Sequence, residues 1–161
     1  MSYFAAVLTR AGDRWRAGEA EVDDAESLTD LADLLRDHRG DVRVLVIEQD
    51  DEYAAIIRLD ADEDDPRPFL SDGHAADAYP IAAVVAEDLV EIGEDELEDD
   101  EDAPPAHDSA PFGDADIVED LGTSASDLLG MCGHPGTLPI DVLVAICEKA
   151  GCGEPFEDLR G

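Results

Sequence analysis

Val42-Arg-Val-Leu-Val-Ile47 and Tyr53-Ala-Ala-Ile-Ile-Arg-Leu59 are two apolar runs rich in β-branched residues. The polar stretch Gln49-Asp-Asp-Glu52 separates them. β-branched residues favour extended strands, and two such runs around a short polar stretch are typical of a hairpin. We therefore predict an antiparallel hairpin over 42–59.

The preceding segment predicts a second hairpin and a helix. The apolar run Tyr3–Leu8 leads to the turn signal Ala11-Gly-Asp13, and a looser strand returns over 15–22. Leu28, Leu31, Leu34 and Leu35 then follow with the spacing of an amphipathic helix, behind a capping box formed by Ser27 and Asp30. Gly40 is the expected end of this helix.

The next segment adds a short strand at Phe69-Leu-Ser71, a helical turn at 71–79 and an apolar stretch from Ile81 to Ala86. Residues 1–92 thus read as an α+β domain, with an antiparallel sheet of hairpins and helices on one face.

Charge divides the chain. The 43 acidic and 10 basic residues give a net charge of −33, and residues 87–120 contain 16 acids and no base. The stretch 93–113 combines the densest acids with Pro104, Pro105 and Pro111. Like charges at this density repel one another, so we predict an acidic, proline-containing linker over 93–113.

Residues 114–161 predict a small helical module. Helices are expected over 116–121, over 124–133 with Ser124 as the cap, and from Pro139 to a stop at Gly151. These 48 residues make a marginal independent core, so we expect the module to dock on another surface.

Composition excludes several classes of function. A charge of −33 argues against direct binding to nucleic acid or to an anionic membrane, because both need cations. We expect a cytoplasmic protein with reduced thiols, since there is no signal peptide, no apolar run of 18 residues and an odd count of 3 cysteines. The acidity also fits a salt-adapted proteome.

Two groups of residues resemble metal sites. Cys132, His134, Cys147 and Cys152 are zinc ligands by type, but their spacing is poor for a tetrahedral site, and buried thiols are the commoner outcome. Asp60-Ala-Asp-Glu-Asp64 begins like a calcium-binding loop, but Asp65 replaces the turn glycine and Ser71 the last glutamate. We therefore predict no metal and no cofactor.

No arrangement of side chains predicts catalysis. A phosphate loop, a nucleophile elbow and the H-E-x-x-H motif are all missing from the sequence, and Ser124 and Ser126 fit a helix start. The zinc deaminase signature H-x-E with a later P-C-x-x-C is also missing. The chain is therefore not predicted to be an enzyme.

The sequence resembles the actinobacterial family of tRNA adenosine deaminase-associated proteins along nearly its whole length. The similar segments are Ser2–Leu8, Asp13-Arg-Trp15, Leu28–Leu35, Val42–Leu59, Pro68-Phe-Leu-Ser-Asp72, the acidic middle, Gly113–Ile117, Asp120-Leu-Gly122, Leu128-Leu129, Leu138-Pro139 and Leu143. The resemblance implies a link to the enzyme that converts adenosine to inosine in the tRNA anticodon, with no catalytic residues to transfer.

Two functions remain open. The first, implied by the resemblance, is a non-enzymatic accessory or regulatory partner of a tRNA adenosine deaminase. The alternative is an acidic binding module, a polyanion mimic that occupies basic nucleic-acid-binding surfaces in general. In both, the acidic block would make the contact through Glu94, Asp95, Glu96, Glu98, Asp99, Asp100, Glu101 and Asp102. The same block also reads simply as a solvated linker.

Overall fold

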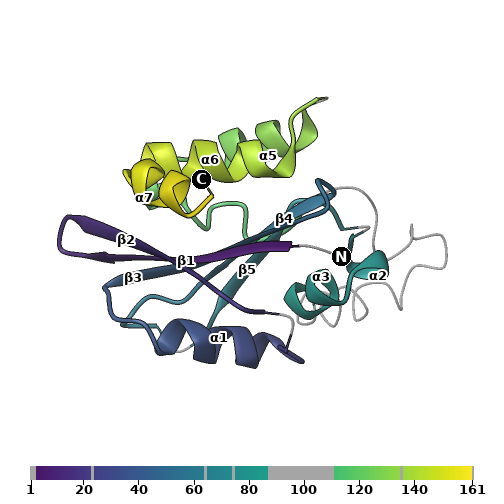
Figure 1. Cartoon of the computed structure of the whole chain (residues 1–161). Coiled ribbons are helices and arrows are strands. Elements are labelled where there is room, and N and C mark those ends of the chain that lie inside the picture. The colour runs from purple at the N-terminus through teal and green to yellow at the C-terminus, as the bar shows by residue number, and fades with distance from the viewer. Residues whose placement is uncertain are drawn as a thin grey trace.

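A six-stranded antiparallel sheet forms the centre of the protein (Figure 1). The computed structural model describes residues 3–22, 24–63, 65–73, 75–86, 111–134 and 136–160. The strand order is β2-β1-β3-β4-β5-β6. The strands are β1 (Tyr3–Ala11), β2 (Arg14–Glu19), β3 (Val42–Gln49), β4 (Tyr53–Arg58), β5 (Arg67–Leu70) and β6 (Phe112–Gly113).

The predicted hairpin over 42–59 is confirmed as β3 and β4. Asp50 and Asp51 make its turn in the left-handed region, with φ of 55° and 58°. Aspartate tolerates this conformation better than most residues. The Glu48 carboxylate accepts a hydrogen bond from the Asp51 backbone N–H at 2.9 Å, which holds the turn closed.

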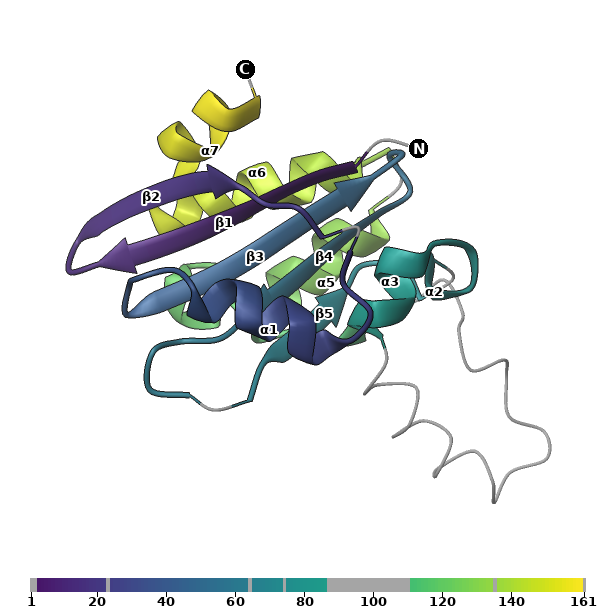
Figure 2. The ribbon, with the colours of Figure 1, turned by 60° about the horizontal axis from the view of Figure 1, so that its bottom comes forward.

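One face of the sheet is covered by N-terminal helices, as predicted (Figure 2). These are α1 (Leu28–Arg36), α2 (Ala75–Ala78) and α3 (Pro80–Val85). Ser27 caps α1 as predicted and accepts from the Asp30 N–H at 3.3 Å, but the Asp30 carboxylate accepts from the Glu26 N–H, so the predicted capping box is only half formed. The helix ends at Arg36, before the predicted end at Gly40. Leu31 and Leu35 are fully buried against the strand side chains that point to this face.

The C-terminal helices cover the other face of the same sheet. They are the 3₁₀ helix η1 (Glu119–Leu121), α5 (Ala125–Gly133), α6 (Pro139–Ala150) and α7 (Gly153–Arg160). Leu128, Leu143 and Phe156 lie in a second core with the opposite set of strand side chains. The predicted helical module is therefore docked on the predicted sheet, and the α+β class is confirmed. No helix among the described residues is long and apolar enough to cross a bilayer.

Two elements were not predicted, namely α7 and β6. Gly113, the last residue of the predicted linker, pairs with Phe69 of β5. Its φ is +103°, and a Cβ at this position would lie 2.4 Å from the Pro68 carbonyl oxygen, so only glycine fits here. The division into domains 1–92 and 114–161 remains a prediction, because its boundary at residue 92 lies outside the described residues. At the other boundary, Gly113 belongs to a strand of the sheet and not to a linker.

Arg58 ties the C-terminal part to the sheet. Its guanidinium is buried and donates to both carboxylate oxygens of Asp60, at 2.9 Å each. It also donates to Asp120 at 2.6 and 2.8 Å and to the Ile117 carbonyl oxygen at 2.8 Å. A bidentate guanidinium–carboxylate pair is strong because both bonds are charge-assisted.

Asp120 should make stability depend on pH. The hydrogen bond from Arg58 holds the pKa of Asp120 below its ordinary value of 3.8. A lowered folded-state pKa stabilises the protein above that ordinary value, and the contribution is lost as the pH falls through the folded pKa. The Asp120 side chain is 61% exposed, so Asp120→Asn should cost less than about 1 kcal/mol at pH 7.

Chemical unfolding of both proteins at pH 7 and at several pH values below 4 measures this difference. The two free energies of unfolding should converge as Asp120 of the wild type becomes protonated. A difference that stays constant down to the lowest pH would show that the Asp120 charge does not act through Arg58.

Candidate interaction surfaces

The predicted partner-binding residues lie outside the described residues. Glu94 through Asp102 fall within 87–110, of which the structure gives no description. The assignment of these acids as a contact surface therefore stays a prediction.

The C-terminal face formed by Leu128, Leu143 and Cys147 is not available to a partner. All three side chains have 0% of their surface exposed, because they face the sheet. Packing in the core therefore explains why these three side chains are apolar.

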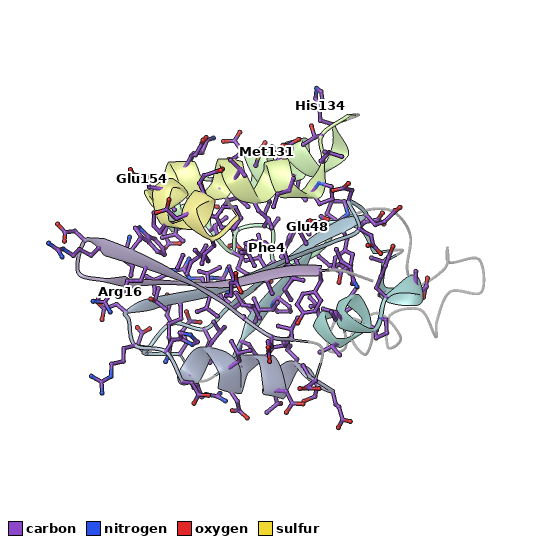
Figure 3. The ribbon with its side chains drawn as sticks, viewed as in Figure 1. Phe4, Arg16, Glu48, Met131, His134 and Glu154 are labelled. Carbon is purple, nitrogen blue, oxygen red and sulfur yellow. The ribbon has the colours of Figure 1, made fainter. Side chains whose placement is uncertain are left out.

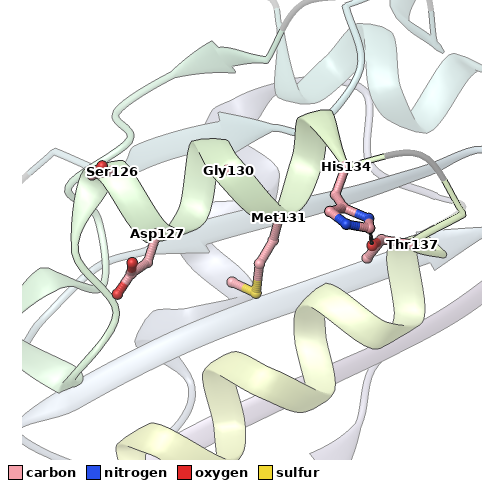
Figure 4. Close-up of a pocket in the computed structure, with 6 residues that line it drawn as sticks. All are labelled: Ser126, Asp127, Gly130, Met131, His134 and Thr137. Carbon is pink, nitrogen blue, oxygen red and sulfur yellow. Dashed lines mark hydrogen bonds between the residues drawn. The ribbon is translucent and has the colours of Figure 1, made fainter.

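A shallow groove lined by polar and apolar groups lies on the outer surface of the C-terminal layer. It has a volume of about 390 Å³ and is lined by Ser126, Asp127, Gly130, Met131, His134 and Thr137. Figure 4 shows Met131 pointing from α5 into this space, with the His134 ring near Thr137. The Thr137 hydroxyl lies 3.3 Å from His134 Nδ1, and Asp127 pairs with Lys149 of α6 at 3.5 Å.

Two leucines of the C-terminal part are also exposed. Leu129 and Leu138 are 43% and 44% exposed, and they are the large apolar side chains with the greatest exposure in the part of the chain that the structure describes. His134 itself stands at the outer end of the layer (Figure 3). The groove thus offers apolar area and one histidine, which suits contact with another protein more than chemistry.

The cysteines occupy two separate environments. Cys147 and Cys152 are buried where α6 ends, and the Cys152 N–H donates to the Cys147 carbonyl at 2.8 Å. Gly151 between them is left-handed, at φ +96°, and its N–H bonds the Glu148 carbonyl. This is a Schellman motif, whose apolar contact joins the residues at these two positions.

The thiols of Cys132 and Cys147 are poor nucleophiles in this state, whereas the hydrogen bond from Cys147 lowers the pKa of Cys152. A hydrogen bond to Cys152, together with burial, raises the pKa of Cys147. Burial raises the pKa of Cys132 on α5 to about 11. Because only a thiolate attacks or binds a metal well, these values keep both sulfurs protonated at neutral pH.

Asp60, Asp62 and Glu63 form the one group of potential metal ligands within the described residues, with ligand atoms within 4.8 Å of one another. Asp60 is already bound by Arg58. His38, by contrast, lies beside the Leu34 carbonyl at the end of α1, 3.0 Å away through Nδ1. Asp60 and His38 thus each have a structural contact within the fold.

Comparison with known proteins identifies the family. A family model described as "Rv3753c-like tRNA adenosine deaminase-associated protein" matches residues 3–153. The chain belongs to this family. No curated protein and no solved structure gives a significant match.

Members of the Rv3753c-like family are described as associated with the deaminase, not as the deaminase itself. The resemblance seen in the sequence is therefore confirmed over nearly the whole chain. The exposure of Leu129 and Leu138 was missed by sequence reasoning, because helical periodicity does not tell which leucines of a short apolar helix face outward. Pro139 after Leu138 was a usable signal, since a residue before a helix start often lies at the surface.

Proposed function

We propose that this Rv3753c-like protein is a non-enzymatic partner that binds a tRNA adenosine deaminase directly and limits its access to tRNA. The observation that carries the proposal is charge. Residues 87–120 hold 16 acids and no base, in a chain whose family is described by its association with this enzyme.

The acidic segment is complementary in charge to a tRNA-binding surface. An enzyme that holds an anticodon loop must present cations to the phosphate backbone. A run of carboxylates such as Glu94–Asp102 complements the same cations, so it competes with tRNA for them. The folded sheet and its two helical layers would supply the specific contact beside that surface.

Steady-state kinetics test the competition. Added protein should raise the Michaelis constant of the deaminase for tRNA and leave the maximal rate unchanged. The effect should weaken steeply from low to physiological salt, because exposed charges are screened over roughly 8–10 Å. Replacing the eight acids within 94–102 by Asn and Gln should remove most of it.

A matched variant shows whether position or total charge matters. Neutralising eight acids on the described surface, including Asp33, Asp37 and Asp62, changes the net charge by the same amount outside the segment. This control should inhibit like the wild type. Inhibition that is insensitive to salt and to both variants would contradict the proposal and point to an apolar contact, for which Leu129 and Leu138 are the exposed candidates.

A second candidate function follows from the same charge. The acids of 87–102 show no periodic pattern, so nothing in their order selects one basic partner over another. A general polyanion mimic would then bind many nucleic-acid-binding proteins with similar affinity. Selectivity for the deaminase separates the two functions.

A further inference from the structure

Three arginines have no ion-pair partner among the described residues, in a protein with 43 acids and 10 bases. Among the described cations, Arg36, Arg58, Arg67 and Lys149 form ion pairs. Arg43 is buried and donates to backbone carbonyls, and Arg10 lies over the Trp15 ring at 5.5 Å. The exposed side chains of Arg14, Arg16 and Arg39 form no ion pair or side-chain hydrogen bond with the described residues.

Arg14 and Arg16 share one face of the sheet, and the backbone next to Arg39 lies at the same end. Arg14 and Arg16 are two residues apart on β2, so their side chains point to the same side. Thr9 of β1 is the cross-strand partner of Arg16. Gly40, which follows Arg39, lies so close to this strand that a Cβ on it would be 3.1 Å from Thr9 Cβ.

This side of β2 is exposed at Arg14 and Arg16 within the described part of the chain. The helix α1 packs on β3 and β4, whereas α7 packs on β2 from the opposite face. Figures 1 and 2 show the β1–β2 hairpin extending beyond α1, and Figure 3 places Arg16 at that end. Asp13 precedes Arg14 in the turn, but the two form no ion pair.

The strand β2 is also an edge of the sheet, paired with β1 on one side only. Its outward N–H and C=O groups are therefore available to a further strand. The strand is held in place from the other face, because Trp15 Nε1 donates to the Ala150 carbonyl oxygen at 3.0 Å. A fixed edge loses little conformational entropy when another strand adds to it.

We propose that β2 binds an extended acidic segment of a partner protein, which adds as a seventh strand and places alternate carboxylates against Arg14 and Arg16, with Arg39 beside them. Strand addition supplies main-chain hydrogen bonds, and alternate side chains supply specificity. Side chains two apart on a strand are roughly 7 Å apart in both partners, so acids at every second position match the two arginines.

Other occupants fit less well. A second copy pairing through β2 would place arginine beside arginine, which is repulsive. An RNA strand could contact the three arginines, but its backbone cannot form the paired N–H and C=O hydrogen bonds that the free edge of β2 offers. The inference does not depend on the deaminase being the partner.

A designed peptide tests the edge in the full-length chain. The probe is a ten-residue peptide in which glutamate and valine alternate, and the control has the same composition with its glutamates in one block. Backbone amide NMR should show shifts and slower exchange at 14–19 with the alternating peptide, and much weaker effects with the block peptide. Arg14→Glu with Arg16→Glu should weaken binding at least about tenfold, since two attractive pairs become repulsive.

The matched control is Lys149→Glu, which reverses an exposed cation on the other face and should bind like the wild type. Amides of β2 that respond to neither peptide would overturn the proposal and leave the arginines as protection against non-specific strand pairing. Equal binding of both peptides would overturn it in favour of simple charge attraction. A response at 14–19 to a single-stranded RNA oligonucleotide but to neither peptide would overturn it in favour of nucleic acid.

Discussion

Leu143→Ala is expected to lower the free energy of unfolding by about 3 kcal/mol. Leu143 lies in α6 with 0% of its surface exposed, in the core that α6 shares with the sheet. Truncation removes buried apolar atoms and leaves a cavity that a close-packed interior fills only in part. Since this core contains strand side chains, the sheet and the C-terminal helices should unfold together.

Urea unfolding followed by two signals measures both the loss of stability and the joint unfolding. Trp15, the single tryptophan, lies on β2 and reports on the sheet, while circular dichroism at 222 nm reports on the helices. The two transitions should coincide, both shifted in the variant. Leu129→Ala is the matched control, because this leucine lies on α5 and is 43% exposed, so its loss should cost less than about 0.5 kcal/mol. Separate transitions, or equal losses for the two leucines, would contradict a shared core.

Arg58→Met is expected to cost about 3 kcal/mol. Methionine keeps much of the volume but removes the donors to Asp60, Asp120 and the Ile117 carbonyl. Asp60 is only 14% exposed, so its charge would be left partly buried without a partner. The uncompensated carboxylate, more than the lost attraction, makes the change costly.

Arg36→Met serves as the comparison. Arg36 forms an ion pair with Asp33 on the surface of α1 at 2.8 Å, and such exposed pairs contribute little. Unfolding free energies at pH 7 should therefore be nearly unchanged for this variant. A loss at Arg58 as small as that at Arg36 would show that Arg58 does not hold the C-terminal segment on the sheet.

Much of the fold was predictable because local signals agreed with the final packing. The β-branched runs of β3 and β4, the Ser27 and Ser124 caps and the Gly151 stop each appear in the structure where the sequence placed them. Each of these signals acts over a few residues. Local chemistry therefore decides these elements without help from distant contacts.

The packing of the C-terminal helices on the sheet could have been predicted from the sequence of β3. Val44-Leu-Val-Ile47 does not alternate between apolar and polar residues, and in the structure Val44 and Val46 face one core while Leu45 and Ile47 face the other. A strand that is apolar throughout has both faces buried. The apolar run of β3 therefore predicts that helices cover both faces of the sheet.

The missed elements have weak local signals. Helix α7 contains Pro155 and four charged residues, and Phe156 becomes anchored only through contacts such as the edge-on packing with Phe4 at 5.5 Å. Strand β6 has two residues and exists only through its pairing with β5. The exposed arginines of β2 were equally hard to predict, because strand propensity does not show which face of an edge strand stays exposed after folding.

Direct binding of the deaminase is the central claim, and sedimentation velocity of purified components tests it most directly. The labelled Rv3753c-like protein is mixed, at physiological salt, with a tRNA adenosine deaminase from the same organism or with an unrelated basic RNA-binding protein of similar charge. We expect a faster-sedimenting complex with the deaminase that saturates at a fixed ratio, and no complex with the basic control protein. Two independently sedimenting species with the deaminase, or equal complexes with both proteins, would contradict it.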